Sequence, residues 1–207
     1  MTDFTVFSIE GRVGERAMGD GNKDSVRFDQ HGAMVADFGG KYAEAARRGK
    51  IFSASNVAAQ AVTVALATTY TGLLLYNPAA SGKRIVLLKA KYALTVAPAG
   101  IASLHLLRVP TGTFTHTTPL AAPGIVSTKI GSGLASAMGA DSAATIPTPT
   151  YLMSAGSGFT AGALYADSQT WLDIDGAITI EPGNGIAWGA LTAVTGFGSF
   201  MWMEEAE

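Results

Sequence analysis

The sequence contains no cysteine and very little charge. Its 207 residues include no Cys, which excludes disulfide bridges, thiolate metal sites and cysteine nucleophiles. Only 14% of the residues are charged, and 14 basic against 16 acidic side chains leave a net charge of −2. Such a chain has no electrostatic attraction for phosphate backbones or anionic membranes. We therefore expect neither nucleic acid nor a membrane as its partner.

One uncharged stretch has the length of a membrane span. No charge lies between Lys50 and Lys83, and residues 57–76 form an apolar-leaning window of bilayer-spanning length. That window contains five Gln and Thr residues, and the rest of the chain after residue 50 is similarly poor in charge. We expect no membrane span, and the first 20 residues lack the features of a signal peptide.

The charge that is present is concentrated at the N-terminus. Sixteen charged residues lie in the first 50 positions, and 14 are spread over the remaining 157. Glycines recur through residues 1–40 and interrupt any helical or strand pattern. The sequence therefore predicts an extended N-terminal arm over residues 1–50 and a folded body over residues 51–207.

A short helix is predicted at the end of this arm. Residues 41–48 read KYAEAARR, with good helix formers, arginines in the last turn, and Gly49 in position to end the helix. Two turns are too short to be stable alone in water. We expect this helix to pack on the body or on a neighbouring subunit.

The body has the pattern of a β protein. From Ile51 onward, Thr, Val, Ala, Gly and Ser alternate in character between frequent turn signals, and no helical pattern intervenes. This predicts an all-β fold, an antiparallel β-sandwich or jelly roll. The predicted strands are 51–55, 61–68, 72–76, 84–96, 101–109, 125–129, 150–153, 170–174, 177–180, 185–191 and 198–203.

Two connections within the body are distinctive. Residues 181–184 read EPGN, with Pro and Gly at the positions that a type II turn requires. This turn predicts a β connection between the strands at 177–180 and 185–191. Residues 131–169 are rich in Gly, Ala, Ser and Thr and predict a long excursion between strands, of the kind that makes contacts.

Histidines and carboxylates give little indication of chemistry. His31, His105 and His116 share no ligand spacing. Asp173 and Asp175 are the only close acidic pair in the low-charge interior of the body, and in a strand their spacing puts both on one face, as a cation site or a glycosidase would need. The alternative is a strand that ends in an Asp-Gly hairpin turn. No phosphate-binding loop or nucleophile elbow is present, and we expect no enzyme activity, no cofactor and no metal.

Aromatic residues gather in the last 40 positions. Trp188, Phe200 and Trp202 lie in predicted strands, and residues 200–203 alternate Phe and Trp with Met. Apolar side chains on both faces indicate a strand in a core or in an interface between subunits. We assign these three residues to self-association. An exposed platform of tryptophans that binds carbohydrate is the alternative.

Three segments carry a resemblance to a known family. They are GKYAEAARRGK at residues 40–50, ALATTYTGL at 65–73 and NPAASGKRIVLL at 77–88. Together they resemble virion-associated structural proteins of tailed bacteriophages, of the capsid cement or decoration type. The resemblance implies a β-rich homotrimer, made in the host cytoplasm and located on the capsid surface, whose arm clamps the shell.

These observations define the expected function. We expect a capsid decoration protein that stabilises the head by binding the major capsid protein and copies of itself. The arm residues expected to bind the partner are Arg12, Arg16, Arg27, Arg47 and Arg48. The alternatives are a head or tail fibre that contacts host glycans, and a glycan hydrolase or lyase that uses Asp173 and Asp175.

Overall fold

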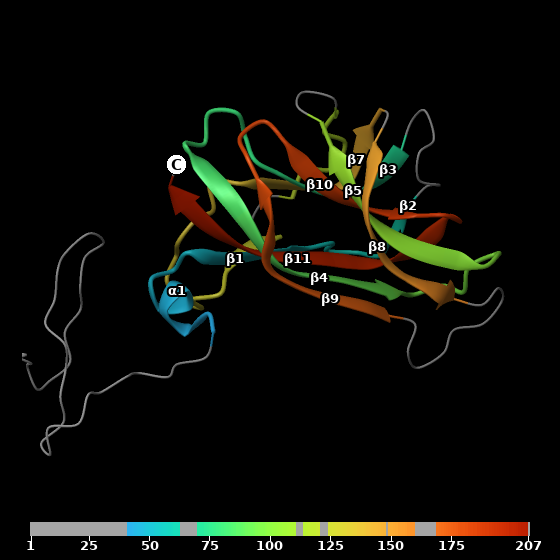
Figure 1. The fold of residues 1–207 in the computed structure, drawn as a ribbon, viewed down its shortest axis with the longest axis horizontal. Coiled ribbons are helices and arrows are strands. Elements are labelled where there is room, and N and C mark those ends of the chain that lie inside the picture. Colours follow the sequence, from blue (N-terminus) through green and yellow to red (C-terminus); the bar gives the residue numbers. More distant parts are fainter. Residues whose placement is uncertain are drawn as a thin grey trace, which may run out of the picture. The chain divides into compact units, whose positions relative to one another are not determined.

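The computed structural model describes residues 41–62, 70–110, 114–120, 124–147, 149–159 and 169–206. Most of the predicted arm, residues 1–40, lies outside the described residues. In the unit from Glu44 to Glu207, two antiparallel sheets pack face to face around one hydrophobic core (Figure 1). The predicted β-sandwich is confirmed.

The predicted helix is present but shorter, as α1 (Ala43–Arg47). It ends where expected, at Gly49, which has a φ of 70°. The amide of Gly49 donates to the carbonyl of Ala46 and that of Lys50 to the carbonyl of Ala45, both at 2.9 Å. This pair of bonds is the Schellman motif, which satisfies the last helix carbonyls and turns the chain into the first strand.

The first sheet holds most of the long strands. Its order is β6-β1-β11-β4-β9, and β2 also pairs with β11. The strand bounds are β1 (Ile51–Ser55), β2 (Gln60–Val62), β4 (Lys83–Leu94), β6 (Ile125–Ser127), β9 (Gln169–Ile180) and β11 (Val194–Ala206).

The second sheet covers the inner face of the first. Its order is β7-β3-β10-β5-β8. The strand bounds are β3 (Tyr70–Tyr76), β5 (Ala102–Val109), β7 (Gly139–Ile146), β8 (Thr150–Phe159) and β10 (Gly185–Ala190).

The first strand of the body pairs with the last, and each further pair joins strands that lie closer to the middle of the sequence. The pairs are β1 with β11, β3 with β10, β4 with β9 and β5 with β8, and successive pairs alternate between the two sheets. β9 and β10 are joined by the predicted turn at 181–184, where Asn184 N donates to Glu181 O at 3.2 Å. The turn therefore crosses from one sheet to the other.

Large aromatic side chains fill the space between the sheets. Trp188 on β10 stacks on Phe200 of β11 with ring centroids 6.0 Å apart and meets Tyr92 of β4 edge-on. Trp202 lies beside Phe52. Gly198 makes room for this packing, because a Cβ there would lie 3.1 Å from the Trp188 ring. The contacts of Trp188 with Phe200 and Tyr92 join the two sheets across the core.

Two predictions about the strands were wrong. Residues 131–169 include β7 and the whole of β8, so the excursion is shorter than expected. β7 reads GADSAATI and has few of the residues that usually mark a strand. The predicted Asp-Gly hairpin is a bulge inside the continuous strand β9, where Asp175 has a φ of 55° and Gly176 one of 87°.

Candidate binding surfaces

The first question for the described residues is whether any of their side chains could bind a metal ion. Within the part of the chain that the structure describes, no group of three His, Asp or Glu side chains could hold a metal ion. No helix among those residues has the length and apolar character needed to cross a bilayer.

The two histidines of the described residues, His105 and His116, have different partners. His105 is hydrogen-bonded to the Ser103 hydroxyl at 2.8 Å and packs against Tyr151, and burial lowers the pKa of its imidazole. His116 lies 3.4 Å from Asp141, which is on the edge strand β7 of the second sheet. His31 is outside the described residues.

Asp141 is a structural carboxylate. It is fully buried and accepts hydrogen bonds from the amides of Thr117, Thr118 and Ala143 at 2.9 to 3.0 Å. Two of these donors lie on the segment that runs along the outer edge of β7, where isolated bridges join it to β7. Asp141 therefore fixes the segment that covers this sheet edge.

Asp173 does not have the environment of a general acid. Asp173 is exposed and accepts hydrogen bonds from Lys89 at 2.8 Å and from the Trp171 indole at 3.2 Å. The bond from Lys89, and then that from Trp171, holds the pKa of Asp173 below its usual range. A general acid needs the opposite shift, so Asp173 is suited to a surface ion pair.

The arginines predicted to bind a partner fall into two groups. Arg12, Arg16 and Arg27 lie outside the described residues. Arg47 and Arg48 are exposed at the end of α1, and the Arg48 guanidinium pairs with Glu44 at 2.7 Å. Their role in binding stays a prediction.

The structure corrects the assignment of Trp188, Phe200 and Trp202 to self-association. Trp188 and Trp202 are 0% exposed and Phe200 is 1% exposed within the single chain. Their side chains fill the core between the sheets, so they cannot contact a second copy. The sequence pattern indicated burial on both faces of 200–203, but Met201 and Met203 are only partly buried on the outer face of the first sheet.

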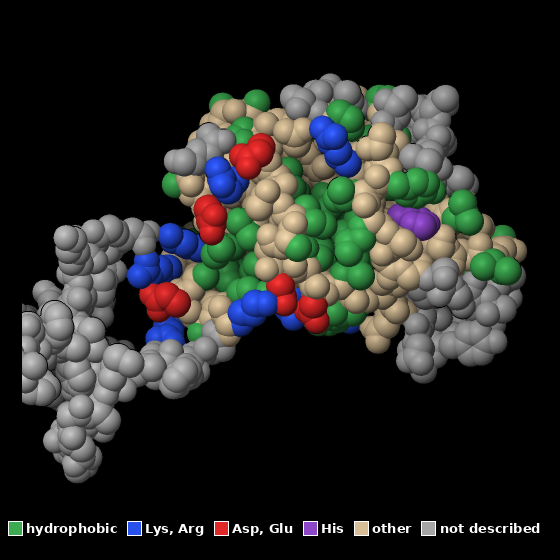
Figure 2. Space-filling model, viewed as in Figure 1, with side chains coloured by type: hydrophobic (Ala, Val, Ile, Leu, Met, Phe, Trp, Pro, Cys, Tyr) green, Lys and Arg blue, Asp and Glu red, His purple; other side chains and the backbone are tan. Residues whose placement is uncertain are grey.

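An apolar surface lies elsewhere, where the edge strands β8 and β9 face each other. We call it the open side and define it by Tyr151, Leu152, Met153, Leu172 and Ile178. The three β8 residues are 44%, 46% and 42% exposed, and the two β9 residues pack partly on the core. A cleft between Leu152 and residues 178–180 separates the strands. Figure 2 shows hydrophobic side chains gathered in the middle of the molecule, with charged side chains of both signs around them.

Irregular pairing explains why three consecutive residues of β8 are exposed. The register between β5 and β8 shifts at three places, so β8 carries extra residues and the usual in-and-out alternation is lost. Sequence reasoning found the strand at 150–153 but could not find the bulges. The run of three apolar residues in a strand without charge was the available signal.

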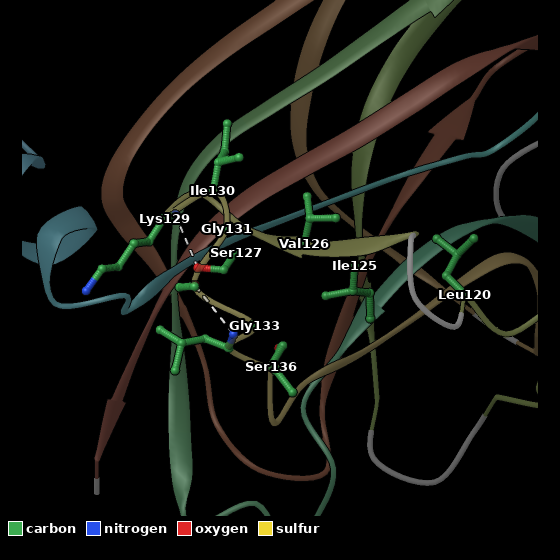
Figure 3. A pocket seen from close by; sticks show the side chains of 12 residues that line it. Leu120, Ile125, Val126, Ser127, Lys129, Ile130, Gly131, Gly133 and Ser136 are labelled. Carbon is green, nitrogen blue, oxygen red and sulfur yellow. Dashed lines mark hydrogen bonds between the residues drawn. The ribbon is translucent and has the colours of Figure 1, made fainter.

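A second apolar feature borders β6, at the opposite edge of the first sheet. This β6 groove has a volume of about 670 Å³ and is lined by Leu120, β6 and residues 129–136. The chain turns after β6, where Ser132 N donates to Lys129 O at 3.1 Å, and then returns past the strand (Figure 3). Figure 3 also shows Ile125 and Val126 pointing to opposite sides of β6.

The returning wall of the groove is held at two points. Leu134 occupies the position that a Cβ of Gly49 would need. Farther along, the buried Glu204 carboxylate accepts hydrogen bonds from Ser136 Oγ at 2.5 Å and Ala137 N at 3.1 Å, and pairs with Lys83 at 2.7 Å. The groove is therefore part of the folded body.

Comparison of the chain with family models, curated proteins and solved structures gives no match.

Proposed function

We propose that this protein is a structural component of a bacteriophage virion, a capsid decoration (cement) protein that stabilises the head. In this proposal it assembles as a homotrimer on the capsid surface and binds the major capsid protein through residues 1–50. The observation that carries the proposal is the open side, an uncharged apolar surface of the kind that often marks a protein–protein contact. The assignment to a virion rests on the resemblance carried by residues 40–50, 65–73 and 77–88.

The open side favours association with copies of the same chain. Strand β8 contains no charged residue, whereas exposed edge strands normally carry lysines or other charges that discourage association. The rim carries Arg108 and Glu181 beside the cleft, and Asp173 on β9. Charges of both signs around an apolar centre allow one copy to complement another in a symmetric oligomer.

The strand order also supports the proposal, since we assign the sandwich to the jelly-roll class. Strands pair from the two ends of the body inward, in alternating sheets, as in a long hairpin rolled into a sandwich. The eight main strands are then β1, β3, β4, β5, β8, β9, β10 and β11. β2 is an addition after the first of them, and β6 and β7 are additions between the fourth and the fifth. Jelly rolls are frequent in viral capsids and also in lectins, so the fold alone does not decide the function.

Capsid binding by a truncated chain tests the role of the arm. The body has its own core, so a chain that lacks residues 1–40 is expected to fold and to keep the oligomeric state of the full chain. It should no longer co-sediment with capsids that lack the native protein, because most of the arm and three of its five predicted binding arginines, Arg12, Arg16 and Arg27, are gone. Capsid binding retained at full strength by the truncated chain would contradict the role of the arm.

Trp171 favours a second function, the binding of host glycans by a head or tail fibre. Its indole is 55% exposed on β9, and the ammonium groups of Lys89 and Lys91 each lie 5.2 Å from its ring centroid. An exposed indole with polar neighbours can stack on a sugar ring. Glycan-array binding that is lost in Trp171→Ala, with the fold intact, would favour this function over decoration.

A further inference from the structure

We infer that the β6 groove binds one extended segment of the shell protein, which adds as a strand to the free edge of β6. This inference rests on the proposed function and names the chemistry of the partner segment. The segment would be a single β-strand with apolar side chains and a carboxylate.

The backbone of β6 offers outward-pointing hydrogen-bonding groups to such a strand. In its ladder with β1, Thr128 N donates to Ile51 O at 3.0 Å and Ser55 N donates to Gly124 O at 3.4 Å. Antiparallel pairing alternates, so the N–H and C=O groups of Ile125 and Ser127 point away from β1. Among the described strands β6 pairs only with β1, and such an edge is a template for strand addition.

The side chains along the groove specify an apolar partner. Val126, Ile130 and Leu134 are 48%, 96% and 46% exposed. An added strand would cover these side chains together with the backbone groups of β6. Because the wall at residues 133–136 closes the far side of the groove, the space suits one extended chain and not the sheet edge of a second folded copy.

The charge of the groove indicates which charge the partner segment should carry. Lys129 is the one charged residue among those that line the groove, and it forms no ion pair with the described residues. A carboxylate on the added segment would pair with its ammonium group. An extended segment of the shell protein with alternate apolar residues and one acidic residue meets all three requirements.

A proline substitution tests strand addition selectively. Ser127→Pro removes the outward N–H and leaves the inward pairing of Val126 with Ser53 in place, and proline is tolerated at edge positions of this kind. Ser127→Ala removes the hydroxyl but keeps the N–H, and is the matched control. Full-length proteins would be mixed with capsids that lack the native protein, and binding measured by co-sedimentation, after thermal unfolding has shown that each variant is folded.

We expect Ser127→Pro to bind capsids about tenfold more weakly than the natural protein, and Ser127→Ala to bind within about twofold. If the natural protein binds and folded Ser127→Pro binds equally well, the groove is not the site, although the proposed function stands. If the natural protein does not bind capsids, both proposals are wrong.

Hydrogen exchange gives a second readout that needs no variant. On binding to capsids, the amides of Ile125 and Ser127 should become protected, whereas the Val126 amide, already paired with Ser53, should change little. This alternation distinguishes strand addition from general coverage of the surface. Unchanged exchange at Ile125 and Ser127 in the capsid-bound protein would overturn the inference even if Ser127→Pro fails to fold.

Discussion

Glu204 has an environment unlike that of a typical surface carboxylate. Its side chain is 2% exposed and is bonded to Lys83, Ser136 and Ala137, which come from β4 and from the wall of the β6 groove. Without this carboxylate, the Ser136 hydroxyl and the Ala137 amide lose their acceptor. A single side chain thus joins the sheet to the groove wall.

Replacement of Glu204 by alanine should therefore destabilise the protein. We expect a loss of about 2–3 kcal/mol in the free energy of unfolding, because hydrogen bonds to a charged group are lost and buried donors are left unpaired. Urea denaturation of the variant and of the natural protein measures this loss. The neighbouring Glu205→Ala, on the outer face of β11, is the control and should change stability by less than about 0.5 kcal/mol. Equal effects of the two substitutions would contradict the structural role of Glu204.

His105 gives the protein a dependence on pH. Burial lowers the pKa of its imidazole below the value of 6.5 that it has in the unfolded chain, so between these values the unfolded chain binds more protons. Stability should therefore decline as the pH falls through about 6.5. In His105→Gln, thermal unfolding between pH 5 and 8 should show a smaller decline. An identical decline in the two proteins would show that His105 is not its source.

Single residues also show where sequence reasoning fails. The apolar character of Trp188, Phe200 and Trp202 correctly predicted burial, but periodicity cannot distinguish the core of one chain from an interface between chains. The exposed Trp171 lies in an equally regular strand pattern. Only the assignment of strands to sheets decides which face each tryptophan occupies.

In the proposed function, β8 is the strand on which self-association depends. Leu152→Lys and Met153→Lys place charge in the middle of the open side, where the side chains are about half exposed and tolerate a lysine in the monomer. We expect each variant to shift the oligomer toward the monomer in analytical ultracentrifugation while the fold is kept.

Ile101→Lys is the control for these two variants. Ile101 is 72% exposed and apolar but is not part of the open side, so its replacement should leave the oligomer unchanged. If all three lysine variants dissociate the oligomer equally, or if none does, β8 is not the interface.

Strands with strong apolar alternation were predicted well from the sequence. β1 has the predicted bounds, and β5 and β10 differ by one residue at one end. β7 was missed because small residues suffice where the sheet packs closely, as at Ala140 and Ala144, both almost fully buried. The bulge at Asp175 was misread as a turn because Asp-Gly in the left-handed region occurs in both.

For the whole molecule, the sequence predicted a two-sheet architecture but not its surfaces. Which strands end at the edges follows from long-range pairing, for example of β5 with β8, and local patterns do not specify it. Both candidate surfaces, the open side and the β6 groove, lie at such edges. A sandwich with binding surfaces at two sheet edges can bind two partners at once. A decoration protein would need this, because it would contact neighbouring copies of itself and the shell.

The proposal that the protein decorates a capsid is tested most directly by electron cryomicroscopy of virions of the phage to which the proposal assigns it, with and without the protein. Capsid decoration predicts oligomeric density on the outer surface of the head shell, present only when the protein is present. Density confined to the tail, or particles that look the same with and without the protein, would contradict it.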